Sequence, residues 1–294
     1  MRWLEVSVVT GEEAAEAVGA ILLDLGRGYV EEHADGAVRL TAYVPSGAVG
    51  RASAVRGRVR ALRAFGLDPS PARVTVRTIP ATDWAEAWKK HFRPFRVGRF
   101  LVCPPWQRAQ PAPGEVPLVL DPGMAFGTGL HGSTRLCLQA LAECVRGGET
   151  VFDVGTGSGI LAIAAARLGA GRVVAIDNDP LACRIAAANA RANGVAERVT
   201  VRAGDLLRGV RVRADLILMN IVAPAIVRAA PQVVRRLRAG GRFVASGIVA
   251  SSLTPVLSAV SRAGLSVDRE LAEGEWRCVV CSAQSPDRLA TTVR

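Results

Sequence analysis

Two carboxylates and a glycine-rich turn are the parts of this sequence best suited to hold a small ligand. Asp153 lies in a short apolar run, and three glycines follow at alternate positions, Gly155, Gly157 and Gly159. Glycines let a backbone turn tightly and approach a ligand without Cβ collisions. Asp177 ends the next apolar run, 22 residues after Gly155. A carboxylate at that place can accept hydrogen bonds from both ribose hydroxyls of an adenosine-containing cofactor.

These residues need a strand, a turn and a helix to position them, and the neighbouring sequence predicts all three. Residues 150–154 are mostly β-branched or aromatic and predict a buried strand. Residues 160–168 are rich in Ala and Leu and predict a helix whose first amides face the same ligand. Residues 172–177 predict the next strand. The glycines alone are weak evidence for a nucleotide cofactor, but the acid after the second strand makes the pattern more specific.

Three polar residues lie at the predicted ends of strands. Asn220 ends the fourth apolar run, where open α/β sheets place reacting groups, and its side-chain oxygen could hold an amine nucleophile. The competing interpretation is a strand-end turn residue. Asp205 follows the third strand and is interpreted equally well as an adenine contact or as a loop acid. For Asp177 the alternative to ribose binding is an N-cap of the helix predicted from Pro180.

A hydroxyl pair opens the helix predicted over residues 130–144. Ser133 and Thr134 lie in its first turn and are either caps or neighbours of the cofactor loop, because this helix leads directly into the glycine-turn strand. His131 is interpreted as a loop or core histidine rather than as a base.

The glycine turn leaves a choice between a nicotinamide dinucleotide and S-adenosylmethionine. Asp153 would repel a pyrophosphate but suits a cofactor with a cationic amino-acid moiety. The glycine strand is also preceded by a helix with its own loop, whereas a dinucleotide fold usually carries its fingerprint early in the domain. These features favour S-adenosylmethionine. Methyl transfer to an amine held at Asn220 is then an in-line displacement, and an attacking lysine must first lose its proton in a dry pocket.

The order of predicted elements divides the chain into four parts. Residues 1–80 read strand-helix-strand-strand-helix-strand, the ferredoxin-like α+β arrangement, and we interpret them as a docking module rather than a structural cap. Residues 81–115 are a linker with a short helix over 83–92. Residues 116–283 alternate strands and helices and end in a strand pair, which predicts an α/β doubly wound sheet with an antiparallel edge hairpin. Residues 284–294 are a tail.

Composition bounds the remaining function classes. The chain has 294 residues and a net charge of +11, and of its 37 basic residues only Lys89 and Lys90 are lysines. This bias indicates a genome-wide preference for arginine as much as an RNA surface, so ribosomal RNA contact is expected to be incidental. Without an apolar run long enough for a membrane span or a signal peptide, a cytoplasmic location is expected. The sequence favours a monomer only weakly.

The six cysteines are expected to be free thiols. Cys278 and Cys281 have the spacing of half a zinc site, but they lie in an apolar strand-like run and no second pair or nearby histidine accompanies them. We interpret them as packing residues and predict no metal site.

The chain resembles the ribosomal protein L11 methyltransferase family (PrmA) over nearly its whole length. The residues that carry the resemblance are 3–6, 83–90, 121–129, 153–164 and 220–223. The loop at 121–129 is the most specific part, because general methyltransferases lack it. The family usually shows Gly-Thr-Gly-x-His-x-Thr-Thr, and here Ser133 replaces the first threonine of the pair.

The resemblance implies a class I methyltransferase (Rossmann-like) fold in which Thr134, Gly155, Asp177 and Asn220 contact S-adenosylmethionine. It also implies multi-site methylation of lysine side chains and the N-terminal amine of ribosomal protein L11. The small first domain would recognise that substrate, and the connector would let it present different amines to one active site.

Two other functions remain open. A methyltransferase acting on a glutamine side chain or a nucleobase usually carries Asn-Pro-Pro-Tyr after the fourth strand, with an aromatic ring for stacking; here residues 220–223 lack that ring. A non-enzymatic ribosome assembly factor that binds S-adenosylmethionine is the second alternative.

Overall fold

The structure is a computed structural model that divides the chain into two compact units, 1–93 and 94–294. It describes residues 2–23, 25, 29–34, 36–45, 47, 49–80, 93–107, 109–120 and 131–283. The predicted helix 83–92, the loop 121–129 and the tail 284–294 therefore lie outside the described residues. Each unit has its own hydrophobic core.

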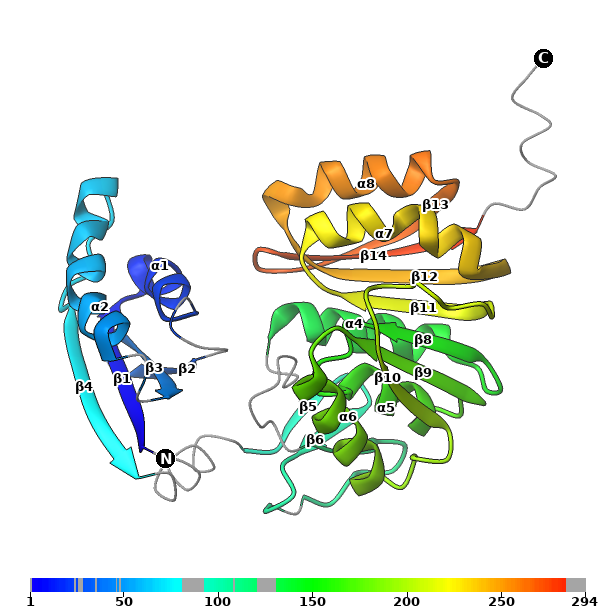
Figure 1. The fold of residues 1–294 in the computed structure, drawn as a ribbon, viewed down its shortest axis with the longest axis horizontal. Coiled ribbons are helices and arrows are strands. Elements are labelled where there is room, and N and C mark those ends of the chain that lie inside the picture. The colour runs from blue at the N-terminus through cyan, green and yellow to red at the C-terminus, as the bar shows by residue number, and fades with distance from the viewer. Residues whose placement is uncertain are drawn as a thin grey trace. The chain divides into compact units, whose positions relative to one another are not determined.

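The first unit has the predicted ferredoxin-like fold (Figure 1). Its elements are β1 (Arg2–Gly11), α1 (Glu12–Leu23), β2 (Val30–Ala34), β3 (Ala37–Pro45), α2 (Val49–Ala61) and β4 (Arg73–Pro80). The strand order is β2-β3-β1-β4, and every pair is antiparallel. Alternate residues of β1, among them Val6 and Val8, turn inward against Leu22 of α1 and Val55 of α2.

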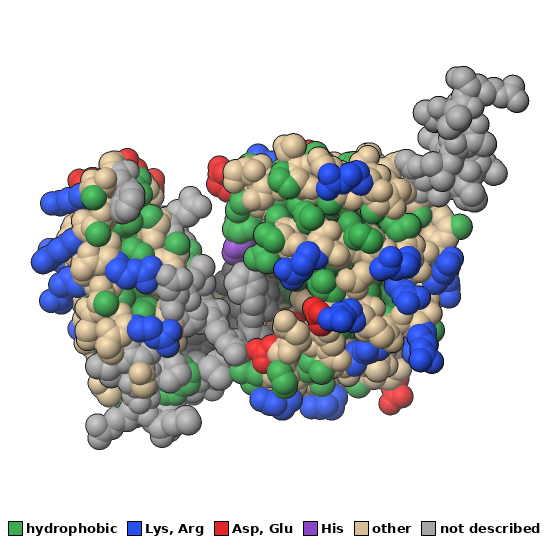
Figure 2. Space-filling model, turned by 45° about the horizontal axis from the view of Figure 1, so that its top comes forward, with side chains coloured by type: hydrophobic (Ala, Val, Ile, Leu, Met, Phe, Trp, Pro, Cys, Tyr) green, Lys and Arg blue, Asp and Glu red, His purple; other side chains and the backbone are tan. Residues whose placement is uncertain are grey.

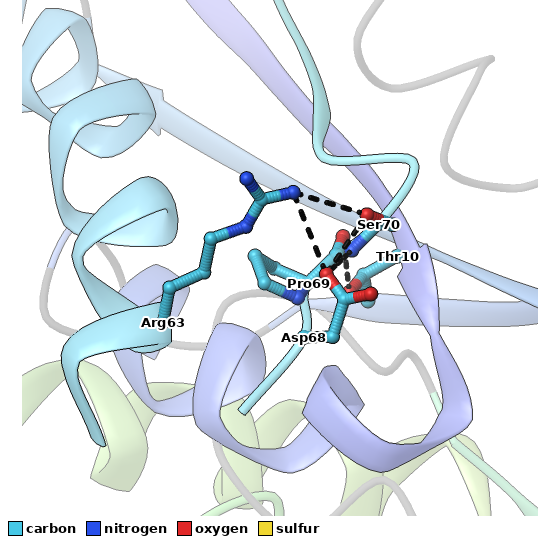
Figure 3. A network of polar contacts seen from close by, with 5 residues as sticks. All are labelled: Thr10, Arg63, Asp68, Pro69 and Ser70. Atoms are coloured by element: carbon cyan, nitrogen blue, oxygen red, sulfur yellow. Dashed lines mark hydrogen bonds and ion pairs between the residues drawn. The ribbon is translucent and has the colours of Figure 1, made fainter. Parts of the chain in front are cut away.

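A polar network fixes the turn that leads from α2 into β4 (Figure 3). Thr10 of β1 is fully buried, and its hydroxyl donates to the carbonyl of Pro69 at 3.0 Å. The Asp68 carboxylate accepts from the amide and hydroxyl of Ser70 at 3.1 and 2.8 Å and pairs with Arg63 at 3.5 Å. The hydrogen bonds from Ser70 lower the pKa of Asp68. This network satisfies the polar groups of the turn internally, so we assign it a structural role.

The second unit contains the predicted doubly wound sheet with an antiparallel hairpin (Figure 1). Its main elements are α4 (Gly132–Cys144), β8 (Thr150–Val154), α5 (Ile160–Arg167), β9 (Arg172–Asp177), α6 (Pro180–Ala192), β10 (Val199–Ala203), β11 (Ala214–Asn220), α7 (Ala223–Arg236), β12 (Leu237–Val249), α8 (Leu253–Arg262), β13 (Leu265–Glu273) and β14 (Trp276–Ala283). The strand order is β10-β9-β8-β11-β12-β14-β13, and β8 to β12 are parallel. The last strand, β14, lies inside the sheet, antiparallel to β12 and β13.

Helices cover both faces of this sheet. One core cluster joins α4, α5 and α6 to one face, and a second joins α7 and α8 to the other. Cys278 belongs to the first cluster and Cys281 to the second, so these two thiols point to opposite faces and cannot share a metal ion. All six cysteines are free, as predicted.

The segment after Pro94 belongs to the second unit, which differs from the linker boundaries predicted from the sequence. Three short strands, β5 (Phe95–Val97), β6 (Phe100–Cys103) and β7 (Val116–Val119), form a sheet of their own. Phe100, Val102 and Leu118 are fully buried in the cluster with α4 and α5. Burial of these apolar side chains explains why residues 94–115 belong to the second unit instead of connecting two domains.

Within the described part of the chain, no helix has both the length and the apolar character needed to cross a membrane.

Candidate active site

The glycine turn is tied to the end of the neighbouring strand β9. The amides of Gly155 and Thr156 donate to the carbonyl of Ile176 at 2.8 and 3.0 Å. The amide of Gly157 donates to the Asp177 carboxylate at 2.9 Å. The structure therefore brings together Gly155, Gly157 and Asp177, as the sequence predicted, at the carboxyl ends of β8 and β9.

Gly155 is a position where a side chain would be poorly tolerated. Its φ is +74°, a left-handed conformation that residues with a Cβ rarely adopt. A Cβ there would lie 2.3 Å from Cγ2 of Ile221. Since Ile221 follows Asn220 directly, bare backbone at Gly155 allows the turn and the end of β11 to approach each other.

The Asp177 carboxylate is oriented by the backbone but is not a helix cap. Its Oδ1 accepts from the amide of Asp179 at 2.9 Å, and its Oδ2 accepts from Gly157. Asp179 itself is the N-cap of α6 and accepts from the amide of Leu181 at 2.8 Å. The alternative interpretation of Asp177 as the cap is thereby removed. Each carboxylate oxygen has a second lone-pair direction, so Asp177 can still accept from two hydroxyls.

Asp153 is a buried acid with one unsatisfied oxygen. Its side chain is 1% exposed, and Oδ2 accepts from the Thr156 hydroxyl at 2.6 Å and from the Ala162 amide at 3.0 Å. Among the residues that the structure describes, Oδ1 has no hydrogen-bond partner. Burial raises the pKa of Asp153 to about 6, although the bonds from Thr156 and Ala162 oppose this shift. At neutral pH the group is largely an anion, and no described residue forms an ion pair with it, which favours a cationic ligand.

Asn220 and Thr134 form a pair across 86 positions of sequence. The Asn220 amide group donates to Oγ1 of Thr134 at 2.9 Å. Thr134 is fully buried in the first turn of α4, and that helix has His131 as its N-cap residue without a side-chain capping bond. Thr134 is therefore a partner of Asn220 rather than a cap. Asn220 Oδ1 is buried and, within the described residues, accepts no hydrogen bond.

The tip of the β13–β14 hairpin packs on the start of α4, which the sequence did not indicate. The rings of His131 and Trp276 lie 4.2 Å apart between centroids. His131 Nδ1 is 2.8 Å from the Ser133 hydroxyl, and Arg135 pairs with Glu273. Burial lowers the pKa of His131. No local pattern could predict this contact, because it joins residues about 140 positions apart through the antiparallel strand.

Asp205 is exposed and lies beyond the end of β10. Its carboxylate pairs with Arg208 at 3.5 Å. The amide of the preceding Gly204 donates to the carbonyl of Asp177 at 2.9 Å, so the loop starts beside the end of β9. No contact described by the structure joins the Asp205 side chain to the glycine turn.

These residues fit S-adenosylmethionine. The unsatisfied Asp153 oxygen suits the cationic amino-acid moiety, the oriented Asp177 carboxylate suits the ribose hydroxyls, and the bare backbone at Gly155 permits close approach. Asn220 then provides a fixed acceptor at the same sheet edge.

Comparison with known proteins gives one consistent family. A family model described as "Ribosomal protein L11 methyltransferase (PrmA)" matches residues 2–284. Relatives with that name include one from Pelotomaculum thermopropionicum, which is 44% identical over 94% of this chain and 97% of the relative. Another, from Levilactobacillus brevis, is 39% identical over 98% of this chain and 100% of the relative.

A solved structure supports the same conclusion. The crystal structure of ribosomal protein L11 methylase from Lactobacillus delbrueckii subsp. bulgaricus has a TM-score of 0.63 and 32% identity, covering 66% of this chain and 100% of that chain. The methyltransferase fold expected from the sequence is confirmed.

Proposed function

Because the chain belongs to the ribosomal protein L11 methyltransferase (PrmA) family, we propose that it methylates lysine side chains and the N-terminal amine of ribosomal protein L11, with S-adenosylmethionine as methyl donor and Asn220 as the residue that orients the amine. One observation carries the assignment of Asn220: its amide group is anchored on Thr134 at 2.9 Å, while its oxygen is buried and unpartnered within the described residues. An N–H of the substrate amine satisfies that oxygen.

Asn220 aligns the amine for in-line attack. The cofactor supplies a methyl group on a positively charged sulfur. The Thr134 hydroxyl accepts from the amide nitrogen of Asn220 and so fixes which way its oxygen points. Holding the nucleophile in one orientation removes entropy from the barrier, which is the main aid that a displacement of this kind needs. The partly buried side chain of Ile221 lies next to Asn220 in the sequence, and an apolar neighbour favours the neutral, reactive form of a lysine amine.

The other predicted residues hold the cofactor. Asp177 accepts from the ribose hydroxyls of the cofactor. The backbone of Gly155 and Gly157 contacts the cofactor, and Asp153 stabilises the cofactor's ammonium group. Asp205 accepts from the adenine amino group. It follows β10, the strand end where this contact is expected, and its exposed carboxylate also pairs with Arg208.

The first unit serves to recognise the substrate. Its polar network at Asp68 is internally satisfied, and the described residues assigned to the cofactor all belong to the second unit. We propose that the protein acts in the cytoplasm as a monomer, and that contact with ribosomal RNA is auxiliary to recognition of L11.

The exposed start of α7 argues against the glutamine or nucleobase alternative. Val222, its N-cap residue, is 67% exposed where enzymes of that type carry residues leading to a stacking aromatic ring. Ala223, which stands at the position of that aromatic ring, has no π-face on which a planar amide or a base could stack.

Transfer of a radiolabelled methyl group tests the function. Purified protein is incubated with labelled S-adenosylmethionine and three acceptors: free L11, L11 with every amine acetylated, and naked ribosomal RNA. We expect label only in free L11. Label in acetylated L11 contradicts an amine substrate, label in RNA supports the nucleobase alternative, and no label anywhere supports a non-enzymatic role.

The role of Asn220 is tested separately by Asn220→Ala. Loss of the acceptor should reduce the single-turnover rate by about 100-fold, on the order of the 3 kcal/mol typical of one positioned polar group, with a smaller change in cofactor affinity. A normal single-turnover rate would exclude Asn220 from orienting the amine.

A further inference from the structure

An arginine-lined groove lies on the α7 side of the second unit. It has a volume of about 710 Å³ and is formed by residues 205–209 of the loop after β10 and by Arg228, Gln232, Arg235 and Arg236 of α7. With Arg208 on the loop, four arginines face one carboxylate, that of Asp205. Figure 2 turns the top of Figure 1 toward the viewer, and basic side chains (blue) are spread over this side of the second unit with few acidic ones (red).

The loop that lines one side of the groove is held in place by contacts with α7 and with the core. The side-chain oxygen of Gln232 accepts from the amide of Leu207 at 3.2 Å and so ties the loop to α7. Leu207 and Val210 are buried in the core cluster beneath α7. The loop is therefore anchored by one hydrogen bond, from Leu207 to Gln232, and by the burial of Leu207 and Val210.

Most of the positive charge in the groove is uncompensated. Asp205 pairs with Arg208. In the part of the chain that the structure describes, Arg228, Arg235 and Arg236 take part in no ion pair or side-chain hydrogen bond. Three like charges held together are unfavourable in the free protein. A bound polyanion removes that repulsion.

We propose that this groove binds the phosphate backbone of RNA. Arg228 and Arg235 are seven residues apart, hence on the same helix face and about 10 Å apart along the axis. A stacked nucleic-acid strand carries one phosphate per roughly 3.4 Å of its helix axis, so with α7 along that axis this spacing matches about three nucleotides. Guanidinium groups bind phosphates and carboxylates alike in pairs of parallel hydrogen bonds, so it is the regular phosphate spacing that favours RNA over an acidic peptide with irregular charge spacing. The assignment of this RNA as ribosomal rests on the proposed function. The proposal that the groove binds phosphate groups is independent of that function.

Filter binding of a labelled single-stranded ribosomal RNA fragment at several salt concentrations tests the proposal without any methyl transfer. The groove variant is Arg228→Gln/Arg235→Gln/Arg236→Gln. The control variant is Arg172→Gln/Arg191→Gln/Arg262→Gln, which removes the same charge from exposed positions on β9, α6 and α8. Loss of three phosphate contacts should reduce the slope of log affinity against log salt by about 2. The ratio of the RNA affinity of the unmodified protein to that of the groove variant should therefore increase about 20-fold when salt is lowered from about 200 mM to about 50 mM.

The outcomes separate the possibilities. A reduced slope in the groove variant alone supports the site, provided that both variants keep the melting temperature and cofactor affinity of the unmodified protein. An equal change in both variants, or in neither, overturns it, because net charge alone would then account for binding. Polyglutamate competition that depends on these three arginines while RNA binding does not would assign the groove to an acidic protein and also overturn it. A chain that binds RNA in this way but fails to methylate L11 would contradict the proposed function only.

Discussion

Replacing Gly155 by alanine tests whether close approach of the glycine turn to the end of β11 shapes the site. Two effects add. A residue with a Cβ in the left-handed region costs about 1–2 kcal/mol. In addition, the new Cβ would lie 2.3 Å from Ile221 Cγ2, whereas carbon atoms in contact are usually about 3.5–4.0 Å apart. Relieving such an overlap in a packed region costs roughly 1–3 kcal/mol. We expect Gly155→Ala to destabilise the second unit by about 2–5 kcal/mol and to weaken S-adenosylmethionine binding at least about tenfold.

The sequence provides a matched control at Gly240. This glycine has φ +72°, nearly the same as Gly155, but nothing lies within 4 Å of the Cβ that alanine would add. Gly240→Ala therefore has the backbone strain without the overlap, and we expect a loss of about 1–2 kcal/mol with unchanged cofactor affinity. Urea unfolding and calorimetry with S-adenosylmethionine measure both quantities.

A double-mutant cycle isolates the overlap. Combining Gly155→Ala with Ile221→Ala removes the colliding methyl group, so the pair should be more stable than the sum of the single changes by about 1–3 kcal/mol. If Gly155→Ala behaves like Gly240→Ala in both assays, and the cycle gives no coupling, the contact with Ile221 does not constrain the turn.

Three further changes test the other site residues. Asp177→Ala should weaken S-adenosylmethionine binding by about 100-fold, since it removes two hydrogen bonds to a charged acceptor; unchanged affinity by calorimetry would refute its ribose role. Thr134→Val should slow single turnover about tenfold by releasing the Asn220 amide, whereas Thr134→Ser should retain the rate. For Asp153, with its pKa raised to about 6, cofactor affinity should fall about tenfold from about pH 7 to pH 5 as the carboxylate is protonated. The free protein should instead gain stability, about 3 kcal/mol in all, as pH falls through 6 toward the unfolded-state value, because the folded state binds this proton more tightly. Both pH effects should be absent in Asp153→Asn.

The sequence predicted those parts of the molecule that local patterns determine. The glycine turn, the acid after β9 and the asparagine after β11 could be placed in one site because the carboxyl ends of parallel strands meet at one sheet edge. The ferredoxin-like order of the first unit followed from alternating strand and helix periodicity. By contrast, the sequence predicted a linker over residues 81–115, because the prolines around β6 and β7 interrupt the pattern. The burial of Phe100 and Val102 depends on contacts with α4 and α5, which no local pattern shows.

Long-range contacts determine what the sequence could not provide. The Thr134–Asn220 bond spans 86 positions, and nothing near either residue distinguishes a cap from a partner. The groove draws its arginines from two segments: α7 supplies Arg228 and the adjacent pair Arg235 and Arg236, and the loop after β10 adds Arg208 from 20 positions earlier. Trp276 reaches His131 only because β14 runs antiparallel to its neighbours.

The position of β14 has a consequence for how this protein is made. Cys278 and Val279 of this strand contribute to the packing on opposite faces of the sheet, and β14 separates β12 from β13. A nascent chain that has emerged only as far as β13 therefore has a gap inside its sheet, with apolar surface on both sides. Completion of the larger unit must wait until β14 has left the exit tunnel, and a premature stop before residue 276 removes an interior strand instead of trimming an edge.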